Sequence, residues 1–315
     1  MGQIKLGIIE LGYREKIDSL SILEQIINYA IEVENKGFSR FWLAEHHYTY
    51  PNHPFSNGEI LLTILAGMTE RIKVGTAGTS ISLYSPYSTA TNFKMLNNLY
   101  SNRIDLGLSK GIPDSKLIMK LANEKLNVDT SFKIFDENLK SIVDLFNNEE
   151  KNLKEHNLLI PPLGGSTPDL WYLSGSYRSF DTVIEHKLNF CRSIFHGTGR
   201  KIEHKKEELL KCKSLYFEKN GHYPEVALAL AVYIGDTIEE ATKKVDDFIA
   251  ETKANAREAF NIIPTTIDLM HEMLLSYQDD FGIDEFIIYD FAVTNEAKIK
   301  NVELISEKFN LLALV

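Results

Sequence analysis

Short apolar runs alternate with longer amphipathic stretches along most of this 315-residue chain, and this alternation limits the possible folds more than any other feature. The short runs are rich in β-branched and aromatic residues and have the length of strands. A strand that is repeatedly followed by a helix is typical of a parallel sheet, because the helix returns the chain to the end where the next strand starts. We predict eight strands, at residues 4–10, 39–44, 72–79, 103–108, 169–174, 188–195, 225–234 and 284–290.

Helices are predicted between these strands. The stretch 18–37, for example, places Leu23, Ile26 and Ile27 at helical spacing and ends at a glycine. Eight strand–helix units in a chain of this length favour an α/β fold with a single closed (β/α)8 TIM barrel over an open, doubly wound sheet. The other predicted helices cover residues 57–69, 86–100, 114–126, 131–148, 177–187, 200–219, 237–251 and 295–310, and residues 254–281 are expected to be mostly helical.

The alternation is interrupted after the fourth predicted strand. We predict that residues 111–168 form an insertion in a barrel domain that covers residues 1–315. The last part of the insertion, residues 150–168, is first charged and then rich in proline and glycine, which is typical of a surface excursion. We expect this excursion to act as a lid. A domain boundary at this position is the alternative interpretation.

The charge balance excludes several classes of partner. The chain has 34 Lys and Arg against 44 Asp and Glu, a net charge of −10, which argues against nucleic acid or an anionic membrane surface as the main partner. No apolar run approaches the length that crosses a membrane, and the N-terminus has no signal-peptide pattern. The two cysteines, Cys191 and Cys212, are too few for a disulfide framework. We expect a cytoplasmic protein.

Polar and small residues gather where the predicted strands end. In a (β/α)8 barrel the active site lies at the C-terminal ends of the strands, so we expect this end to bind a polar ligand. These residues are Glu45, His46 and His47 at the second strand, Gly78, Thr79 and Ser80 at the third, Ser109, Lys110 and Gly111 at the fourth, Ser174, Gly175 and Ser176 at the fifth, His196 at the sixth, and Tyr289 and Asp290 at the last.

The sequence Glu45-His46-His47 permits three interpretations. Neighbouring histidines could bind a metal, but consecutive side chains on an extended segment point to opposite faces, and no helical His/Glu ligand spacing is present. The imidazoles could instead hydrogen-bond to neighbouring loops. We favour an acid/base role for His46, because histidine titrates near neutral pH, and we predict no metal site.

The segment from Ser174 to Ser179 is a candidate phosphate site. It joins a strand to the start of a helix, where free N–H groups and the helix dipole favour an anion. The hydroxyls and Arg178 would add donors, and Lys110 is near enough in the predicted barrel to contribute charge. Capping of the helix by Ser176 is the alternative, and it requires no ligand.

Nucleotide-binding fingerprints are missing from the sequence. It contains no Walker A motif and no Gly-x-Gly-x-x-Gly between a strand and a helix. The small residues from Gly75 to Gly78 lie inside a predicted strand and suggest the close approach of a flat group to the backbone.

Several of these segments together resemble the bacterial luciferase-like flavin monooxygenases. FWLAEHH at 41–47 resembles the second strand of that family, and RIKVGTAGTSISLYSP at 71–86 resembles its third strand and the loop that follows. The segment 89–111, which contains NRIDLGL, is similar to the family's third helix and fourth strand. LWYLSGSYRS, ALALAVYIGDTIEEA and GIDEFIIYD also fit, so that the resemblance extends over nearly the whole chain.

The resemblance implies a fold, a cofactor and a reaction. The family fold is a (β/α)8 barrel that binds reduced FMN at its C-terminal end and uses O2 to oxidise a small organic substrate. It implies that His46 works beside the flavin ring and that Ala77 and Gly78 form a cis peptide under the ring. Because no dinucleotide fingerprint is present, a separate NAD(P)H:flavin reductase is expected to supply the reduced flavin. The implied cofactor-binding residues are Ala77, Gly78, Ser109, Lys110, Ser174, Gly175, Ser176, Tyr177 and Ser179.

The chain departs from the light-emitting members of the family at two positions. Ser109 occupies the place of a reactive cysteine, and Gly175 occupies the place of a glutamate in the phosphate turn. The resemblance therefore does not carry over light emission or an aldehyde substrate. Two other functions stay open, a deazaflavin (F420)-dependent oxidoreductase on the same barrel and a non-catalytic flavin-binding partner subunit.

A homodimer is expected from the predicted helices 57–69 and 86–100. The first carries Ile60, Ile64 and Met68 in addition to other apolar residues, which is a broader apolar stripe than packing on a barrel requires. The resemblance implies pairing through these same helices.

Overall fold

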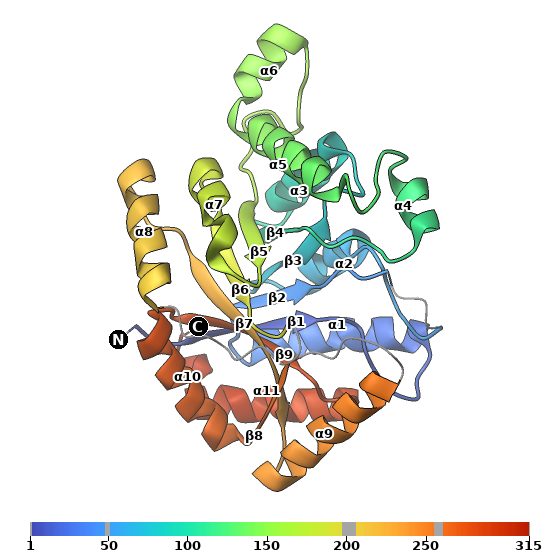
Figure 1. The fold of residues 1–315 in the computed structure, drawn as a ribbon, viewed down its shortest axis with the longest axis vertical. Coiled ribbons are helices and arrows are strands. Elements are labelled where there is room, and N and C mark those ends of the chain that lie inside the picture. Colours follow the sequence, from blue (N-terminus) through green and yellow to red (C-terminus); the bar gives the residue numbers. More distant parts are fainter. Residues whose placement is uncertain (1, 48–50, 197–205, 255–260, 315) are drawn as a thin grey trace.

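The computed structural model describes residues 2–47, 51–196, 206–254 and 261–314. Eight parallel strands close into a barrel in the order β1–β2–β3–β4–β5–β6–β7–β9, and β9 pairs with β1 (Figure 1). The predicted (β/α)8 fold and its eight predicted strands are confirmed. The barrel strands are β1 (Lys5–Glu10), β2 (Arg40–Leu43), β3 (Lys73–Ser80), β4 (Ile104–Ser109), β5 (Asp169–Ser174), β6 (Asn189–Ser193), β7 (Val226–Ile234) and β9 (Glu285–Asp290).

Helices surround the barrel (Figure 1), and local capping explains where several of them start. The Asp18 carboxylate accepts hydrogen bonds from the backbone N–H groups of Leu20 and Ser21, both at 3.0 Å, and α3 starts with a proline. The helices are α1 (Ser19–Asn35), α2 (Glu59–Met68), α3 (Pro86–Leu99), α4 (Lys116–Ala122), α5 (Ser131–Asn147), α6 (Glu149–His156), α7 (Phe180–His186), α8 (Lys206–Asn220), α9 (Ile238–Ala254), α10 (Ile267–Phe281) and α11 (Asn295–Phe309), with the 3-10 turns η1 (Tyr177–Ser179) and η2 (Leu311–Leu314).

A ninth strand, β8 (Ile262–Thr265), lies outside the closed barrel and pairs only with the last residues of β7. The sequence analysis assigned this segment to a mostly helical stretch, and that assignment is wrong for these residues. Four residues are too few to establish a strand period, and Pro264 removes a backbone donor, so that only tertiary pairing with β7 reveals the strand.

The barrel interior contains a buried polar and aromatic cluster. Arg40 pairs with Asp105 at 2.8 Å and with Glu285 at 2.7 Å, and Trp42 Nε1 donates to Asp105 Oδ2 at 2.8 Å. The indole rings of Trp42 and Trp171 meet edge to face, 5.2 Å apart. These contacts join strands that are not neighbours, so they cross the interior and fill it below the C-terminal ends of the strands.

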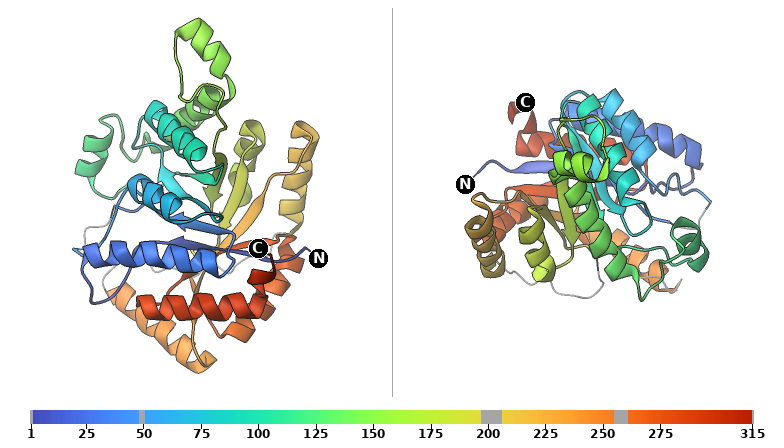
Figure 2. Two further views of the ribbon diagram at one scale, coloured as in Figure 1. Left: turned by 180° about the vertical axis from the view of Figure 1, so that it is seen from behind. Right: turned by 90° about the horizontal axis from the view of Figure 1, so that it is seen from above.

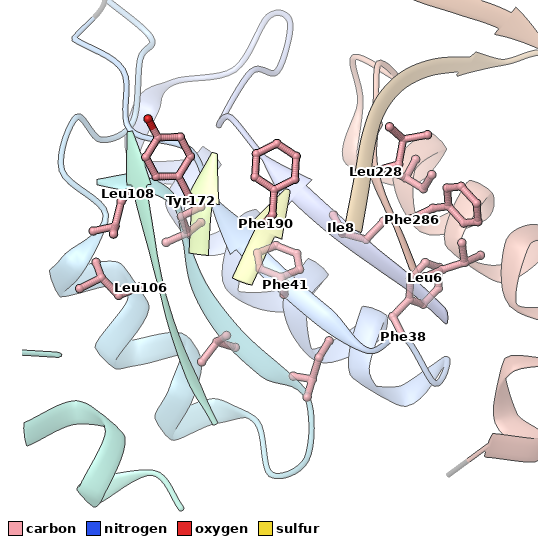
Figure 3. Packing of buried hydrophobic residues seen from close by; sticks show 14 of the residues in the cluster. Leu6, Ile8, Phe38, Phe41, Leu106, Leu108, Tyr172, Phe190, Leu228 and Phe286 are labelled. Carbon is pink, nitrogen blue, oxygen red and sulfur yellow. The ribbon is translucent and has the colours of Figure 1, made fainter. Parts of the chain in front are cut away.

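A second apolar layer separates the strands from the helices. Alternate strand residues such as Leu6, Leu106, Tyr172 and Phe190 project into it (Figure 3), because successive side chains of a strand point to opposite faces. The N-terminal helix α1 and the C-terminal helix α11 lie side by side on this layer (Figure 2). The two ends of the chain therefore meet and complete the barrel.

The insertion between β4 and β5 begins beside the loop that follows β3. Asn123 Nδ2 donates to the Ser82 carbonyl at 3.0 Å, and Asn138 Nδ2 donates to the Ile81 carbonyl at 2.8 Å. Helix α5 packs against α3, and α6 extends away from the barrel (Figure 1). The first part of the insertion thus lies next to the C-terminal ends of the strands.

The second part of the insertion follows the outside of α3. Lys94 Nζ donates to the Ile160 carbonyl at 2.9 Å, and Asn98 Nδ2 donates to the Ser166 carbonyl at 2.8 Å. The lid function that we expected for residues 150–168 stays a prediction. Composition predicts that a segment is exposed, but it carries no information about which surface the segment contacts.

The two cysteines do not form a disulfide. Cys191 is buried, Cys212 is half-buried, and both are free thiols. Among the described residues, no helix has the length and apolar character that crossing a bilayer requires.

Candidate active site at the C-terminal end of the barrel

The predicted site residues lie together at the C-terminal ends of the strands. Ala77 and Gly78 lie in β3, Ser109 ends β4, and Ser174 ends β5. His46 follows β2, and Lys110 follows β4. We refer to this end as the mouth of the barrel. Small side chains line the interior here, including Ala44 and Ala231, whereas the two tryptophans lie below.

The peptide bond between Ala77 and Gly78 is cis, as expected from the family resemblance. The register of β3 against β4 shifts at this point, between Thr76 and Thr79. A Cβ atom on Gly78 would lie 2.6 Å from Leu173 Cδ1 and 2.8 Å from the Gly107 carbonyl oxygen, so no other residue fits here. The glycine is therefore explained by the close approach of β4 and β5 to β3.

The buried carboxylate of Glu45 joins three segments of the mouth. It lies 2.9 Å from His47 Nε2, accepts a hydrogen bond from the Tyr84 hydroxyl at 2.8 Å, and accepts one from the Ser80 N–H at 3.2 Å. Burial and the charge of Glu45 raise the pKa of Tyr84, so that the phenol stays protonated and donates. Glu45 and His47 thus hold the loops after β2 and β3, and the imidazole of His46 does not share this carboxylate contact.

His46 is a neutral imidazole at neutral pH. Burial lowers its pKa to about 4, and the neighbouring imidazoles of His196, His53 and His47 add to the lowering. The His46 carbonyl accepts a hydrogen bond from His53 Nε2 at 2.9 Å. Within the described ranges, no group of three or more His, Cys, Asp and Glu side chains has an arrangement that could hold a metal. A neutral imidazole can accept a proton or a hydrogen bond from a ligand.

His196 is a second imidazole at the mouth, which the sequence analysis noted only as the end of a strand. Its Nδ1 atom lies 2.6 Å from the Ser193 hydroxyl, and its ring lies 4.3 Å from the ring of Phe195. The influence of His196 on the pKa of His46 indicates that the two imidazoles face the same region. Its place at the C-terminal end of β6 was the signal that could have singled it out.

The Ser174–Ser179 turn has the geometry of an uncapped strand-to-helix connection. The Ser176 N–H donates to Ser174 Oγ at 3.3 Å. Within the described part of the chain, neither Ser176, before η1, nor Ser179, before α7, makes a side-chain capping hydrogen bond. The capping alternative for Ser176 is therefore not realised. The Tyr177 ring is buried away from this turn, against Phe180 and Phe190, so that only its backbone can face a ligand.

Lys110 lies beside the same turn. Leu108 of β4 is paired with Tyr172 of β5, which places Lys110 next to the end of β5. Its ammonium group lies 5.1 Å from the Phe135 ring centre and 5.6 Å from the Tyr172 ring centre, and no ion pair of Lys110 occurs among the described residues. A lysine without a carboxylate partner beside three serines suits an anionic group.

Comparison with known proteins identifies the family. The sequence profile of the luciferase-like monooxygenases matches residues 11–279. The chain belongs to the luciferase-like monooxygenase family. The expected resemblance and the expectation of an enzyme are thereby confirmed.

Two Bacillus subtilis members of the family show the range of sequence similarity. The chain is 26% identical to the protein YwcH, with 97% of this chain and 99% of YwcH covered. It is 29% identical to an N-acetyl-S-alkylcysteine monooxygenase, with 77% of this chain and 71% of that protein covered.

Solved structures of low sequence identity share the fold. Apo-MsnO8 superposes with a TM-score of 0.80 at 20% identity and coverage of 98% of this chain and 99% of MsnO8. An F420-dependent secondary alcohol dehydrogenase, in complex with an F420-acetone adduct, gives 0.74 at 13% identity, with 99% of both chains covered. The oxygenating constituent of 3,6-diketocamphane monooxygenase from Pseudomonas putida, in complex with FMN, gives 0.70 at 16% identity, with 98% of both covered.

Proposed function

We propose that this luciferase-like monooxygenase is the oxygenating component of a two-component system, which takes up reduced FMN and uses O2 to oxidise a small organic substrate. The observation that carries the proposal is the uncapped Ser174–Ser179 turn beside Lys110, close to the neutral His46 at the barrel mouth. The similarity to FMN- and F420-binding structures supports a flavin-type cofactor, and we propose that it is FMN.

The residues present fit the phosphate end of such a cofactor. Ser176 and Ser179 have hydroxyls that are not used for capping, and the Ser176 N–H lies at the start of η1. Lys110 supplies a positive charge whose neighbours are aromatic rings. Hydrogen bonds from charged and uncharged donors together bind phosphate more strongly than either kind alone.

Ala77, Gly78 and Ser109 would hold the flavin ring. When bound, reduced FMN supplies the electrons that activate O2. His46, neutral at neutral pH, is proposed to accept or hold a proton at the edge of the ring. Tyr84 and Phe195 would exclude water from the reacting atoms.

A separate reductase is proposed because the chain carries no dinucleotide fingerprint. The structurally similar 3,6-diketocamphane protein is the oxygenating constituent of its monooxygenase, which supports a division of labour of this kind. Under this proposal an NAD(P)H:flavin reductase releases reduced FMN, which then binds to the barrel mouth.

A cover for the mouth is proposed in the first part of the insertion, residues 111–130. Leu83, Met119 and Leu126 form a small apolar cluster there, and Tyr84 packs against it. This segment is tied to the loop after β3, whereas residues 157–168 follow α3. The lid function predicted for the insertion is therefore proposed for its first part only.

A second candidate function is an F420-dependent oxidoreductase. The F420-dependent secondary alcohol dehydrogenase has a higher TM-score than the FMN complex, 0.74 against 0.70. F420 carries a phosphodiester with one negative charge, whereas FMN carries a phosphomonoester with two, so the two candidates differ in the ring and in the charge of the anionic group.

Quenching of tryptophan fluorescence tests these two candidates. The indoles of Trp42 and Trp171 lie in the barrel interior, below the mouth, and serve as reporters. The protein is titrated under anaerobic conditions with oxidised FMN, reduced FMN, oxidised F420 and reduced F420. We expect reduced FMN to bind in the micromolar range and F420 to bind much more weakly.

Oxygen uptake then tests the reaction. A flavin reductase with NADH supplies reduced FMN, and substrate candidates are screened for incorporation of labelled oxygen. Tight binding of F420 without binding of reduced FMN would favour the second candidate. A protein that binds neither cofactor would overturn both.

A further inference from the structure

Arg192 of β6 is a buried cation, and among the described residues it forms no ion pair. The residue is 7% exposed, and within the described part of the chain its Nε and Nη1 atoms have no hydrogen-bond partner. Its guanidinium lies 4.9 Å from the ring centre of Tyr177 and 5.8 Å from that of Phe281. Burial of a charge is costly, and among the described residues the contacts of the guanidinium are with aromatic side chains and not with a carboxylate.

The position of Arg192 connects it to the Ser174–Ser179 turn. Ser174 of β5 and Arg192 of β6 are partners in the strand register. Because side chains alternate along a strand, Arg192 projects on the same side as Phe190, into the layer that also contains Tyr177. The guanidinium therefore lies against the first residue of η1, directly behind the turn.

Lys110 lies on the other side of the same strand end. Its ammonium group lies 5.6 Å from the ring of Tyr172, two residues before Ser174. Lys110 from β4 and Arg192 from β6 thus flank the end of β5, and among the described residues neither one forms an ion pair with a carboxylate. Two uncompensated cations around one serine-rich turn are complementary to a group with two negative charges.

We propose that Arg192 is a positioning residue that makes the Ser174–Ser179 turn selective for a phosphate dianion. Its charge acts on the phosphate across the turn, and its stacking on Tyr177 holds η1 in place. The inference deepens the proposed function and rests on it.

The test compares ligands that differ only in the phosphate. Dissociation constants for FMN and riboflavin are measured by fluorescence quenching for the wild type, Arg192→Met and Arg192→Lys. Arg71→Met, the same change at an exposed arginine outside the mouth, is the matched control, and thermal unfolding without ligand is recorded for each variant.

The expected result is a loss of phosphate preference without a loss of stability. Arg192→Met should weaken FMN about 10- to 100-fold, as expected for one interaction with a charged group, and should leave riboflavin nearly unchanged. Its melting temperature should stay equal or rise, because a buried unpaired charge has been removed. Arg192→Lys should retain most of the preference, and Arg71→Met should retain all of it.

Other results would overturn the inference in distinguishable ways. Equal weakening of FMN and riboflavin, accompanied by a lower melting temperature, would make Arg192 a purely structural residue. An unchanged preference in a folded Arg192→Met protein would overturn the role of Arg192 alone. A wild type that binds riboflavin as well as FMN would overturn both this inference and the assignment of the phosphate site.

Discussion

At the scale of single residues, the pKa of His46 determines which chemistry it can perform. Because burial lowers this pKa to about 4, the imidazole is neutral and cannot act as a general acid at pH 7 without first accepting a proton. Its neighbour His47 contacts the Glu45 carboxylate at 2.9 Å. The two consecutive histidines thus have different environments. That of His46 suits proton transfer, and that of His47 suits holding a loop.

This difference leads to a prediction for the two alanine variants. His46→Ala should bind FMN nearly as well as the wild type, because the phosphate turn is untouched, but turnover should fall by about 10²–10⁴-fold. His47→Ala should lower the melting temperature and reduce turnover less. Steady-state turnover, FMN affinity and melting temperature are measured on both proteins. Wild-type turnover in His46→Ala would contradict the catalytic role.

The serine turn leads to a second prediction at this scale. The double variant Ser176→Ala/Ser179→Ala should weaken FMN by about 1–3 kcal/mol, because hydrogen bonds to a charged group are lost. Riboflavin should be little affected. Isothermal titration of both ligands measures the change, and equal losses for the two ligands would argue that the hydroxyls do not face a phosphate.

At the scale of elements, α2 and α3 leave an apolar face outside the barrel. Leu61 and Leu65 of α2 are buried against the strands, whereas Ile60 is 80% and Met68 is 54% exposed. Leu99 of α3 is 65% exposed, and the two helices are linked by a hydrogen bond from Asn92 to Glu59 at 2.9 Å. An exposed apolar face of this extent supports the proposed homodimer.

The dimer proposal predicts the effect of a charge on this face. The wild type should sediment with twice the mass of the chain, and Ile64→Asp should be monomeric with an unchanged far-UV spectrum, because Ile64 lies at the centre of the exposed stripe. Leu210→Asp, at a similarly exposed position on α8, is the control and should remain dimeric. Analytical ultracentrifugation distinguishes these outcomes, and a monomeric wild type at micromolar concentration would refute the proposal.

At the scale of the whole molecule, a buried ion pair connects the end of β1 to the loop that follows it. Glu10 and Arg14 are each 1% exposed, and Arg14 Nη2 lies 2.9 Å from Glu10 Oε2. Burial alone would raise the pKa of Glu10, but the charges of Arg14 and Lys298 and the hydrogen bonds to the carboxylate lower it to about 2. The folded state therefore holds Glu10 ionised where the unfolded chain would bind a proton.

This pair predicts how stability depends on pH. The contribution of Glu10 is fully present above the ordinary pKa of 4.5 and is lost as the pH falls from there towards about 2. Glu10→Gln should lose about 3–5 kcal/mol at pH 7, because Arg14 stays buried without its partner, and the difference from the wild type should shrink over that acid range. Urea unfolding between pH 7 and pH 2.5 measures both effects.

An exposed ion pair provides the control for this experiment. Lys133 and Glu137 lie 3.8 Å apart, with side chains that are 78% and 63% exposed. Glu137→Gln should change the free energy of unfolding by less than about 1 kcal/mol at every pH. If Glu10→Gln also lowered the free energy of unfolding by less than about 1 kcal/mol, the buried pair would contribute no more than a surface pair.

The sequence by itself determined the barrel, and it led to the prediction of the site. Eight apolar segments separated by amphipathic ones identify a (β/α)8 barrel, and the rule that its site lies at the strand ends singles out His46, Ser109 and Ser174. The cis bond at Ala77–Gly78 was expected from the family resemblance, because small residues alone are compatible with either isomer. These properties are local patterns, which a linear sequence contains.

Only the tertiary structure decided the properties that depend on strand register and burial. The alignment of Arg192 with Ser174 follows from how β6 shifts along β5, which the sequence of neither strand specifies. The lowered pKa of His46 depends on burial and on His196, which lies 150 positions away in the sequence. The stretch that includes Ile160 and Ser166 lies against α3, where it accepts hydrogen bonds from Lys94 and Asn98. Contacts between distant segments thus determine the protonation state of His46 and the positions of Arg192 and the insertion. These contacts form only when the barrel closes.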